Sequence, residues 1–120
     1  MIRKKIINLE RIRQINGGFG FIPHRFLTDG FFTSLNQPEL LLYFFLVLAA
    51  DKNGLSYYSY ERICESIDME LDEYLIARDG LLNNDLIAFD NNVFQVLELP
   101  AKPKSRSGIG SLIKKSLKEA

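Results

Sequence analysis

The chain has 120 residues, of which 47% are apolar and 25% are charged, a size and balance typical of one globular domain and unlike those of disordered proteins. Fifteen basic and fifteen acidic residues give a net charge of zero, and a single cysteine excludes an intrachain disulfide or a multi-cysteine zinc site. The longest apolar run, 40–50, has eleven residues against the ~18–20 that a membrane span needs, and it begins too far along the chain for a signal peptide, so we expect a cytoplasmic protein.

The first segment, 1–15, combines apolar residues at helical spacing with basic residues. The apolar positions are Ile2, Ile6, Leu9 and Ile12. This pattern predicts an amphipathic helix with a basic face. Asn16-Gly17-Gly18 would end it, because these residues tolerate a left-handed backbone. We then expect an extended stretch over 19–23, one helical turn, and a loop around Asp29-Gly30.

The strongest helical signal covers 37–50. Asn36 and Glu39 have the spacing of a capping box, and Pro38 suits a first helical turn. The residues that follow are apolar on every face, so the helix must be buried by its own domain and in part by a partner. This excess of apolar surface allows a homodimer with Phe45 at its interface.

The rest of the chain predicts a strand, two helices and a hairpin. The strand covers 55–58, and Ser59 would cap a helix over 59–67. A further helix covers 71–83, and a β-hairpin covers 86–99 with a polar turn at 90–92. Residues 100–108 have the composition of a linker, and 109–120 would form a short basic helix.

This order of elements resembles the winged helix-turn-helix arrangement, in particular the winged-helix domains of phage and plasmid replication initiators and of small helix-turn-helix proteins of mobile elements. The residues that carry the resemblance are Ile22-Pro23, Glu39 with Tyr43, Gly54-Leu55, Ser59-Tyr60, Ile63-Cys64 and Asp85-Leu86-Ile87. The resemblance implies a mainly α fold with a small β-hairpin as its wing. It divides the chain into a basic N-terminal arm (1–18), a winged-helix domain (19–99) and a basic C-terminal tail (100–120).

The resemblance makes 70–82 the recognition helix, which in such domains lies in the major groove of DNA. Its expected exposed positions are Glu70, Leu71, Asp72, Glu73, Leu75, Ile76 and Asp79. Four carboxylates disfavour an approach to DNA phosphates. Leu71, Leu75 and Ile76 instead indicate a protein interface on the helix 71–83, or alternatively packing against the N-terminal segment.

Charge is strongly segregated along the chain. Residues 1–28 carry a net charge of +5, residues 29–100 carry −10, and residues 101–120 carry +5. Basic ends of this kind bind nucleic acid by neutralising phosphates, or alternatively they pair with the acidic body. The candidate nucleic-acid-binding residues are Arg3, Lys4, Lys5, Arg11, Arg13, Lys102, Lys104, Arg106, Lys114, Lys115 and Lys118.

The sequence contains no pattern typical of an enzyme. His24 and Cys64 stand alone, and no nucleophile–base pair, metal-ligand set or cofactor loop is recognisable. We therefore expect no cofactor, no small-molecule substrate and no membrane partner. The leading hypothesis is a non-enzymatic DNA-associated protein in replication, transposition or transcription regulation on a mobile element. The alternative is a protein-interaction module that docks through its acidic third helix.

Overall fold

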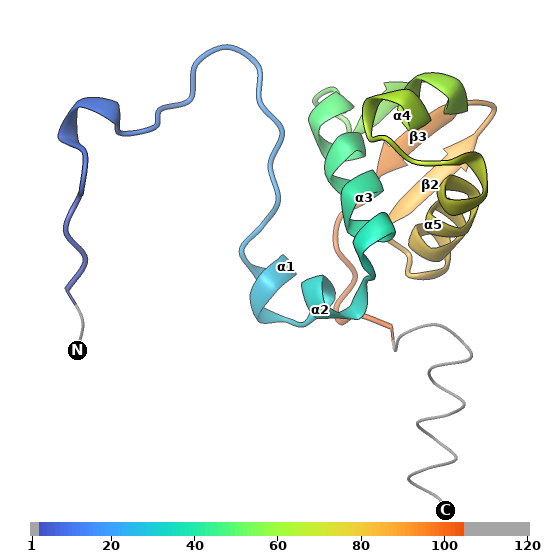
Figure 1. Ribbon diagram of the computed structural model, residues 1–120. Coiled ribbons are helices and arrows are strands. Elements are labelled where there is room, and N and C mark those ends of the chain that lie inside the picture. The colour runs from blue at the N-terminus through green and yellow to red at the C-terminus, as the bar shows by residue number, and fades with distance from the viewer. Residues whose placement is uncertain (1–2, 105–120) are drawn as a thin grey trace, which may run out of the picture.

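The computed structural model of this chain describes residues 3–104. Within that range five α-helices accompany a small three-stranded antiparallel sheet (Figure 1). The elements in chain order are a 3-10 helix (Leu9–Arg11), α1 (Arg25–Thr28), α2 (Phe31–Ser34), α3 (Gln37–Ala49), β1 (Leu55–Tyr57), α4 (Tyr60–Ser66), α5 (Leu71–Asn83), β2 (Ile87–Asp90) and β3 (Val93–Val96). A mainly helical fold with a β-hairpin agrees with this architecture, and β1 adds a third strand to the hairpin.

Helix α3 begins and ends where the sequence predicts. The Asn36 side chain accepts a hydrogen bond from the N–H of Glu39 at 2.9 Å, and the Glu39 carboxylate accepts one from the N–H of Asn36 at 2.8 Å. This reciprocal pair satisfies two backbone donors at the start of the helix. The helix 37–50 of the sequence prediction is therefore confirmed to within one residue.

Helices α4 and α5 also agree with the sequence prediction. Ser59 caps α4, because its hydroxyl accepts a hydrogen bond from the N–H of Arg62 at 3.3 Å. Helix α5 has the bounds 71–83 that the apolar spacing indicates. The short turn between the two helices includes Asp68, which has a positive φ of 52°.

The sheet has the strand order β1-β3-β2, so the last of the three described strands lies at its centre. Asn91 and Asn92 form the two-residue turn of the hairpin, with φ values of 48° and 67° that asparagine tolerates well. Gly54 leads into β1 with a φ of +85°, and a Cβ there would lie 2.5 Å from the carbonyl oxygen of Val96. A glycine is therefore required at this crossing of the two chain segments.

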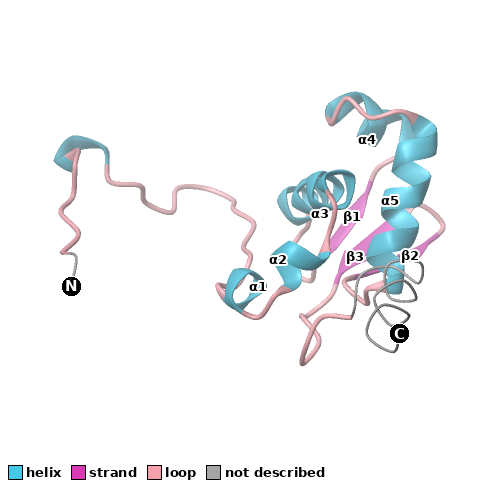
Figure 2. Ribbon diagram, turned by 60° about the horizontal axis from the view of Figure 1, so that its bottom comes forward, coloured by secondary structure: helices cyan, strands magenta, loops and turns pink. Residues whose placement is uncertain are grey.

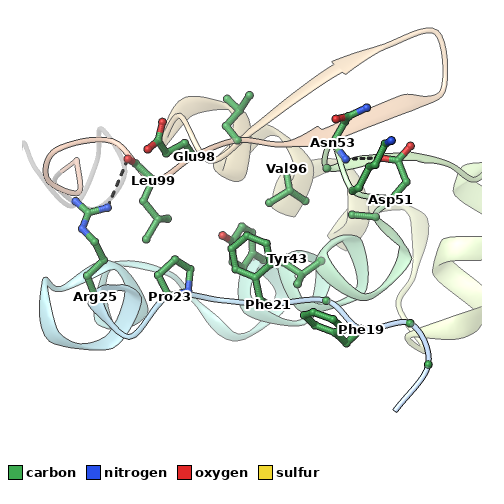
Figure 3. Close-up of a pocket in the computed structure, with 18 residues that line it drawn as sticks. Phe19, Phe21, Pro23, Arg25, Tyr43, Asp51, Asn53, Val96, Glu98 and Leu99 are labelled. Carbon is green, nitrogen blue, oxygen red and sulfur yellow. Dashed lines mark hydrogen bonds between the residues drawn. The ribbon is translucent and has the colours of Figure 1, made fainter. Parts of the chain in front are cut away.

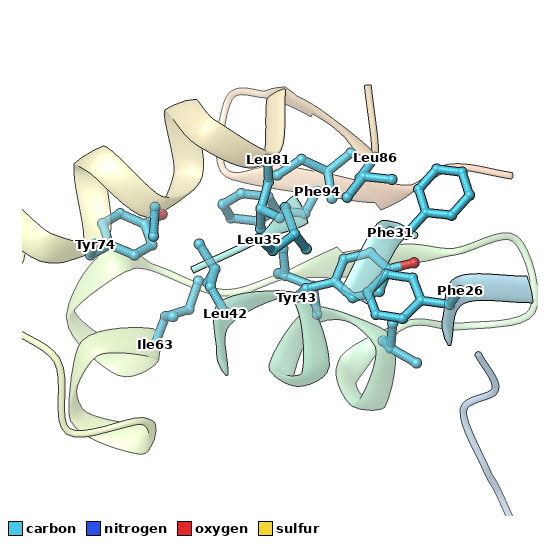
Figure 4. Close-up of a cluster of buried hydrophobic side chains, with 14 of the residues drawn as sticks. Phe26, Phe31, Leu35, Leu42, Tyr43, Ile63, Tyr74, Leu81, Leu86 and Phe94 are labelled. Atoms are coloured by element: carbon cyan, nitrogen blue, oxygen red, sulfur yellow. The ribbon is translucent and has the colours of Figure 1, made fainter. Parts of the chain in front are cut away.

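The hydrophobic core lies between α3, α5 and the sheet (Figures 2 and 4). Leu42 and Leu46 of α3 are fully buried, and so is Leu81 of α5. The two short helices contribute Phe26 and Phe31, whose rings stack with centroids 6.2 Å apart. Phe26 also stacks on Tyr43 of α3, at a centroid distance of 5.1 Å. The sequence predicts one helical turn and a loop after residue 23, whereas the structure has the two short helices α1 and α2 there. Each helix buries one phenylalanine in the core.

Arg25 connects the beginning of the folded body to its end. Its guanidinium donates hydrogen bonds to the carbonyl oxygens of Pro100 at 2.7 Å and Ala101 at 3.0 Å. It also forms an ion pair with Asp29 at 3.1 Å and lies 5.3 Å from the ring centroid of Phe31. This cluster of contacts holds the chain in place just after the last strand.

The expected amphipathic helix over 1–15 is wrong. In the part of this segment that the structure describes, only the single turn Leu9–Arg11 is helical, and the rest is irregular. Ile6 and Ile12 remain 60% and 49% exposed. An isolated helix of this length is marginal in water unless its apolar face packs on something, and these residues do not join the core.

Two further expectations concern other regions. The basic helix expected over 109–120 lies outside the described residues. Among the helices that are described, none combines the length and the apolar character required to cross a bilayer.

Candidate nucleic-acid and protein interfaces

The N-terminal arm presents five basic side chains to solvent. All of Arg3, Lys4, Lys5, Arg11 and Arg13 are exposed. The arm leaves the folded body beside α1, on the side away from α5 (Figures 1 and 2). Within residues 3–104 the ion pairs are Arg25–Asp29 and Arg78–Asp79, so no arm residue pairs there with the acidic body. The structure thus leaves these five charges available to an external anion.

The candidate basic residues of the C-terminal tail are only partly described. Lys102 and Lys104 are exposed, just after the carbonyl groups that Arg25 holds. Arg106, Lys114, Lys115 and Lys118 lie outside the described residues.

Helix α5 presents an acidic face to solvent. Glu70, Asp72, Glu73 and Asp79 are exposed, and the Glu73 carboxylate accepts a hydrogen bond from the N–H of Glu70 at 3.5 Å. Carboxylates in the first turn of a helix are favoured by its dipole, which explains their local stability. They leave this face negative where it meets solvent.

The only basic residue of α5, Arg78, is folded against the protein. Its guanidinium lies 5.0 Å from the ring centroid of Phe89 and 5.9 Å from that of Tyr74. It also pairs with Asp79 at 3.4 Å. These contacts hold the guanidinium against aromatic rings of the same body and beside Asp79, so Glu70, Asp72 and Glu73 still make this face of α5 negative.

The three apolar candidates on α5 differ in their surroundings. Leu75 is half-buried and packs against the core, whereas Leu71 and Ile76 are 45% and 69% exposed. Ile76 lies one helical turn from Asp72, Glu73 and Asp79, so its exposed side chain is surrounded by carboxylates.

The apolar sequence of α3 predicts a helix that is buried on every face, but the described residues do not cover all of it. Leu41 and Leu48 are 44% and 76% exposed. Phe45 lies on the same side but is half-buried, and its ring meets that of Tyr58 edge-on at 5.3 Å. The part of the chain that the structure describes thus leaves an apolar strip along α3, and Phe45 stabilises the domain as well as contributing to this strip.

A groove of about 950 Å³ lies between the extended segment 17–23, the end of α3 and the residues that follow β3 (Figure 3). Phe19, Phe21 and Pro23 form one wall, and Val96 and Leu99 belong to the opposite wall. Tyr43 and Val47 of α3 lie between the two. The sequence predicts the extended stretch but not the groove, because the opposite wall comes from residues about 75 positions later in the chain. Alternation of glycine and phenylalanine over 18–21 was the available signal.

Asp51 organises the loop at one end of this groove. Its carboxylate accepts hydrogen bonds from the N–H groups of Asn53 at 2.8 Å and Leu55 at 3.0 Å. Hydrogen bonds from the N–H of Leu55 and then that of Asn53 lower the pKa of Asp51 below its ordinary value. At neutral pH this rim of the groove therefore carries a negative charge next to the exposed Lys52.

The remaining shifted groups are structural. Burial raises the pKa of Tyr43 and of Tyr74, and it also raises that of the Cys64 thiol. A raised thiol pKa disfavours the thiolate that nucleophilic chemistry needs. Over residues 3–104, no group of three or more His, Cys, Asp or Glu side chains is arranged to hold a metal ion.

Comparison with known proteins identifies no relative of this chain. No protein-family model, curated protein or solved structure matches this chain.

Proposed function

We propose that this chain is a non-enzymatic winged-helix protein that associates with DNA, and that its basic arms hold most of the DNA. The observation that carries the proposal is the separation of charge in space. Five basic arm residues are exposed and make no ion pair with the body within residues 3–104, while the body itself is strongly acidic. Only the arms can therefore neutralise DNA phosphates in number.

The winged-helix assignment is supported by the order of the elements and of the strands. Three helices interrupted by a short strand precede a hairpin, and β1 pairs with β3 at the centre of the sheet. In this assignment α5 is the recognition helix and the turn at Asn91-Asn92 is the tip of the wing. Neither α5 nor the hairpin turn carries a basic side chain that is free of protein contacts, so we assign both elements to roles other than binding phosphates. A place in replication, transposition or transcription regulation of a mobile element rests on the sequence resemblance alone.

A salt series of DNA binding tests the proposal. Binding of the full chain to a fluorescent duplex is measured by anisotropy at several salt concentrations. Engagement of roughly six basic residues gives a slope of log affinity against log salt near −5, from about −0.9 per phosphate neutralised. Replacing Arg3, Lys4, Lys5, Arg11 and Arg13 with Gln weakens binding and makes the slope shallower. The control replaces Arg62, an exposed basic residue of the body outside the groove, and leaves the slope almost unchanged.

The second candidate function is a protein-interaction module that docks through α5. It is favoured by the exposed Ile76 among carboxylates and by the exposed Leu71 nearby in sequence. The same salt series separates the two functions. A full chain that does not bind duplex DNA even at low salt refutes the DNA proposal and favours the interaction module.

A further inference from the structure

The segment that follows the N-terminal arm alternates between the protein body and solvent. Ile22 is half-buried and packs against the core, and Gly20 lies against the end of α3, where a Cβ would come within 2.6 Å of the carbonyl oxygen of Val47. In an extended chain successive residues point to opposite sides. Phe19 and Phe21 accordingly lie on the side of the segment opposite to Ile22, where they line the groove and stay 63% and 74% exposed.

The two exposed rings form part of the groove wall described above (Figure 3). Large aromatic side chains normally bury most of their surface, so two exposed rings on one anchored segment indicate a ligand with an apolar face. The close approach of Gly20 to Val47 places the backbone that carries both rings against the end of α3. The wall is thus held by the fold and is not a loose end of the arm.

The charges around the groove favour an uncharged ligand group inside it. Its lining contains two basic residues, Arg25 and Lys52, and two acidic residues, Asp51 and Glu98. Arg25 is held by backbone carbonyl oxygens. This balance does not attract a phosphate into the groove, whereas a flat neutral ring can enter and stack on phenylalanine.

The arm supplies the complementary positive charge immediately before the groove. Arg11 and Arg13 precede Phe19 by eight and six residues, and both are exposed. A single-stranded nucleic acid has this same division of chemistry, with charged phosphates along one edge and flat neutral bases along the other. Basic residues followed by aromatic stacking surfaces are the usual means by which proteins bind such strands.

We propose that the groove bounded by Phe19 and Phe21 binds the bases of single-stranded DNA, while the adjoining arm binds its phosphates. This inference rests on the proposed DNA association and specifies the form of DNA that the body recognises. In a duplex the faces of the bases are covered by their neighbours, so only unpaired bases can stack on these rings. The arm binds both forms, and the groove adds affinity for single strands alone.

The test compares two probes on the full chain, a thymidine oligonucleotide and a duplex of the same length. Phe19→Ala and Phe21→Ala each lower affinity for the single strand about tenfold, leave duplex affinity unchanged, and leave the salt slope unchanged for both probes. Tyr57→Ala is the matched control, because Tyr57 is 70% exposed but does not line the groove. Circular dichroism confirms that each variant is folded, as the exposure of the substituted rings leads us to expect.

A second measurement locates the bound bases directly. A thymidine oligonucleotide that carries 5-bromodeoxyuridine is irradiated with the full chain, and the cross-linked peptide is identified by mass spectrometry. Cross-links at Phe19 or Phe21 support the proposal. Cross-links confined to other residues, or equal losses of single-strand and duplex affinity in the variants, overturn it. If duplex binding persists and neither substitution changes the affinity for the single strand, the groove is excluded as a base-binding site. The proposal that the arms bind DNA then stands. If the full chain binds neither probe, both proposals fail.

Discussion

The carboxylate of Glu39 in α3 lies directly against Gly80 of α5, so that a Cβ at position 80 would overlap its Oε2 atom. Glu39 is only 9% exposed, and its other oxygen accepts the hydrogen bond from the N–H of Asn36. The capping carboxylate of α3 therefore fills the space beside α5 that is open because residue 80 is a glycine. This contact sets how closely α3 and α5 approach.

The contact predicts an unusual effect of Gly80→Ala. In an exposed helix this change stabilises by about 1 kcal/mol, because alanine has the higher helix propensity. Here the added methyl group must displace a buried carboxylate, so we expect the free energy of unfolding to fall by about 1–3 kcal/mol. Urea denaturation measures the change. In a Glu39→Ala background the same substitution is expected to be neutral or stabilising, and strictly additive effects would contradict the contact.

The lowered pKa of Asp51 predicts a dependence of stability on acid pH. A carboxyl group whose pKa is lowered in the folded state stabilises the fold above its unfolded pKa, and this contribution disappears as pH falls through the folded pKa. Asp51→Asn keeps an oxygen that can accept both backbone hydrogen bonds but removes the charge. The variant is therefore less stable than the parent chain at neutral pH. The difference in free energy of unfolding between the variant and the parent chain becomes smaller below about pH 4. Urea titrations across this range test it, and a difference independent of pH would contradict the assignment.

The acidic face of α5 predicts that its carboxylates do not contribute to DNA affinity. Replacing Glu70, Asp72 and Glu73 with Gln, Asn and Gln removes three negative charges that repel phosphates. We expect duplex affinity to stay the same or to rise modestly, as measured by anisotropy at fixed salt. A marked loss of affinity would show that these carboxylates contact base edges, and it would restore α5 as a reading helix.

The apolar strip of α3 predicts self-association. In sedimentation experiments at high concentration, we expect the parent chain to form a homodimer and Leu48→Glu to remain monomeric. At low concentration, where both chains are monomers, their melting temperatures should agree, because Leu48 is 76% exposed. Phe45→Glu is expected to lower stability as well, since its ring packs on Tyr58. Leu27→Glu, which changes a leucine of α1 that is 65% exposed, is the control. A parent chain that stays monomeric at high concentration contradicts the prediction.

The sequence predicts those parts of the fold whose signals are local. The side-chain acceptors at Asn36 and Ser59 mark helix starts, and Asn91-Asn92 marks the hairpin turn, because each acts within three or four residues of itself. The bounds of α3 and α5 follow from such signals together with apolar spacing. These features need no knowledge of what the helices touch.

The sequence fails where a pattern depends on a distant surface. Apolar spacing over 1–15 satisfies the rule for a helix, but the described part of the segment has no surface to pack on and stays irregular. The groove was not predicted either, because Phe19 and Leu99 become neighbours in one site only after the body has folded. The same is true of Arg25, whose partners are the carbonyl groups of residues 99–101.

The central position of β3 has a consequence for how the chain folds as it is synthesised. Both strand ladders need residues 93–96, and Arg25 finds its acceptors only at 99–101. A nascent chain that ends before residue 93 can form none of these interactions, so it holds α3 with its apolar surface open on the side that the sheet later covers. Since domains fold as units during translation, the body closes in a single late step, when almost its entire length has been made.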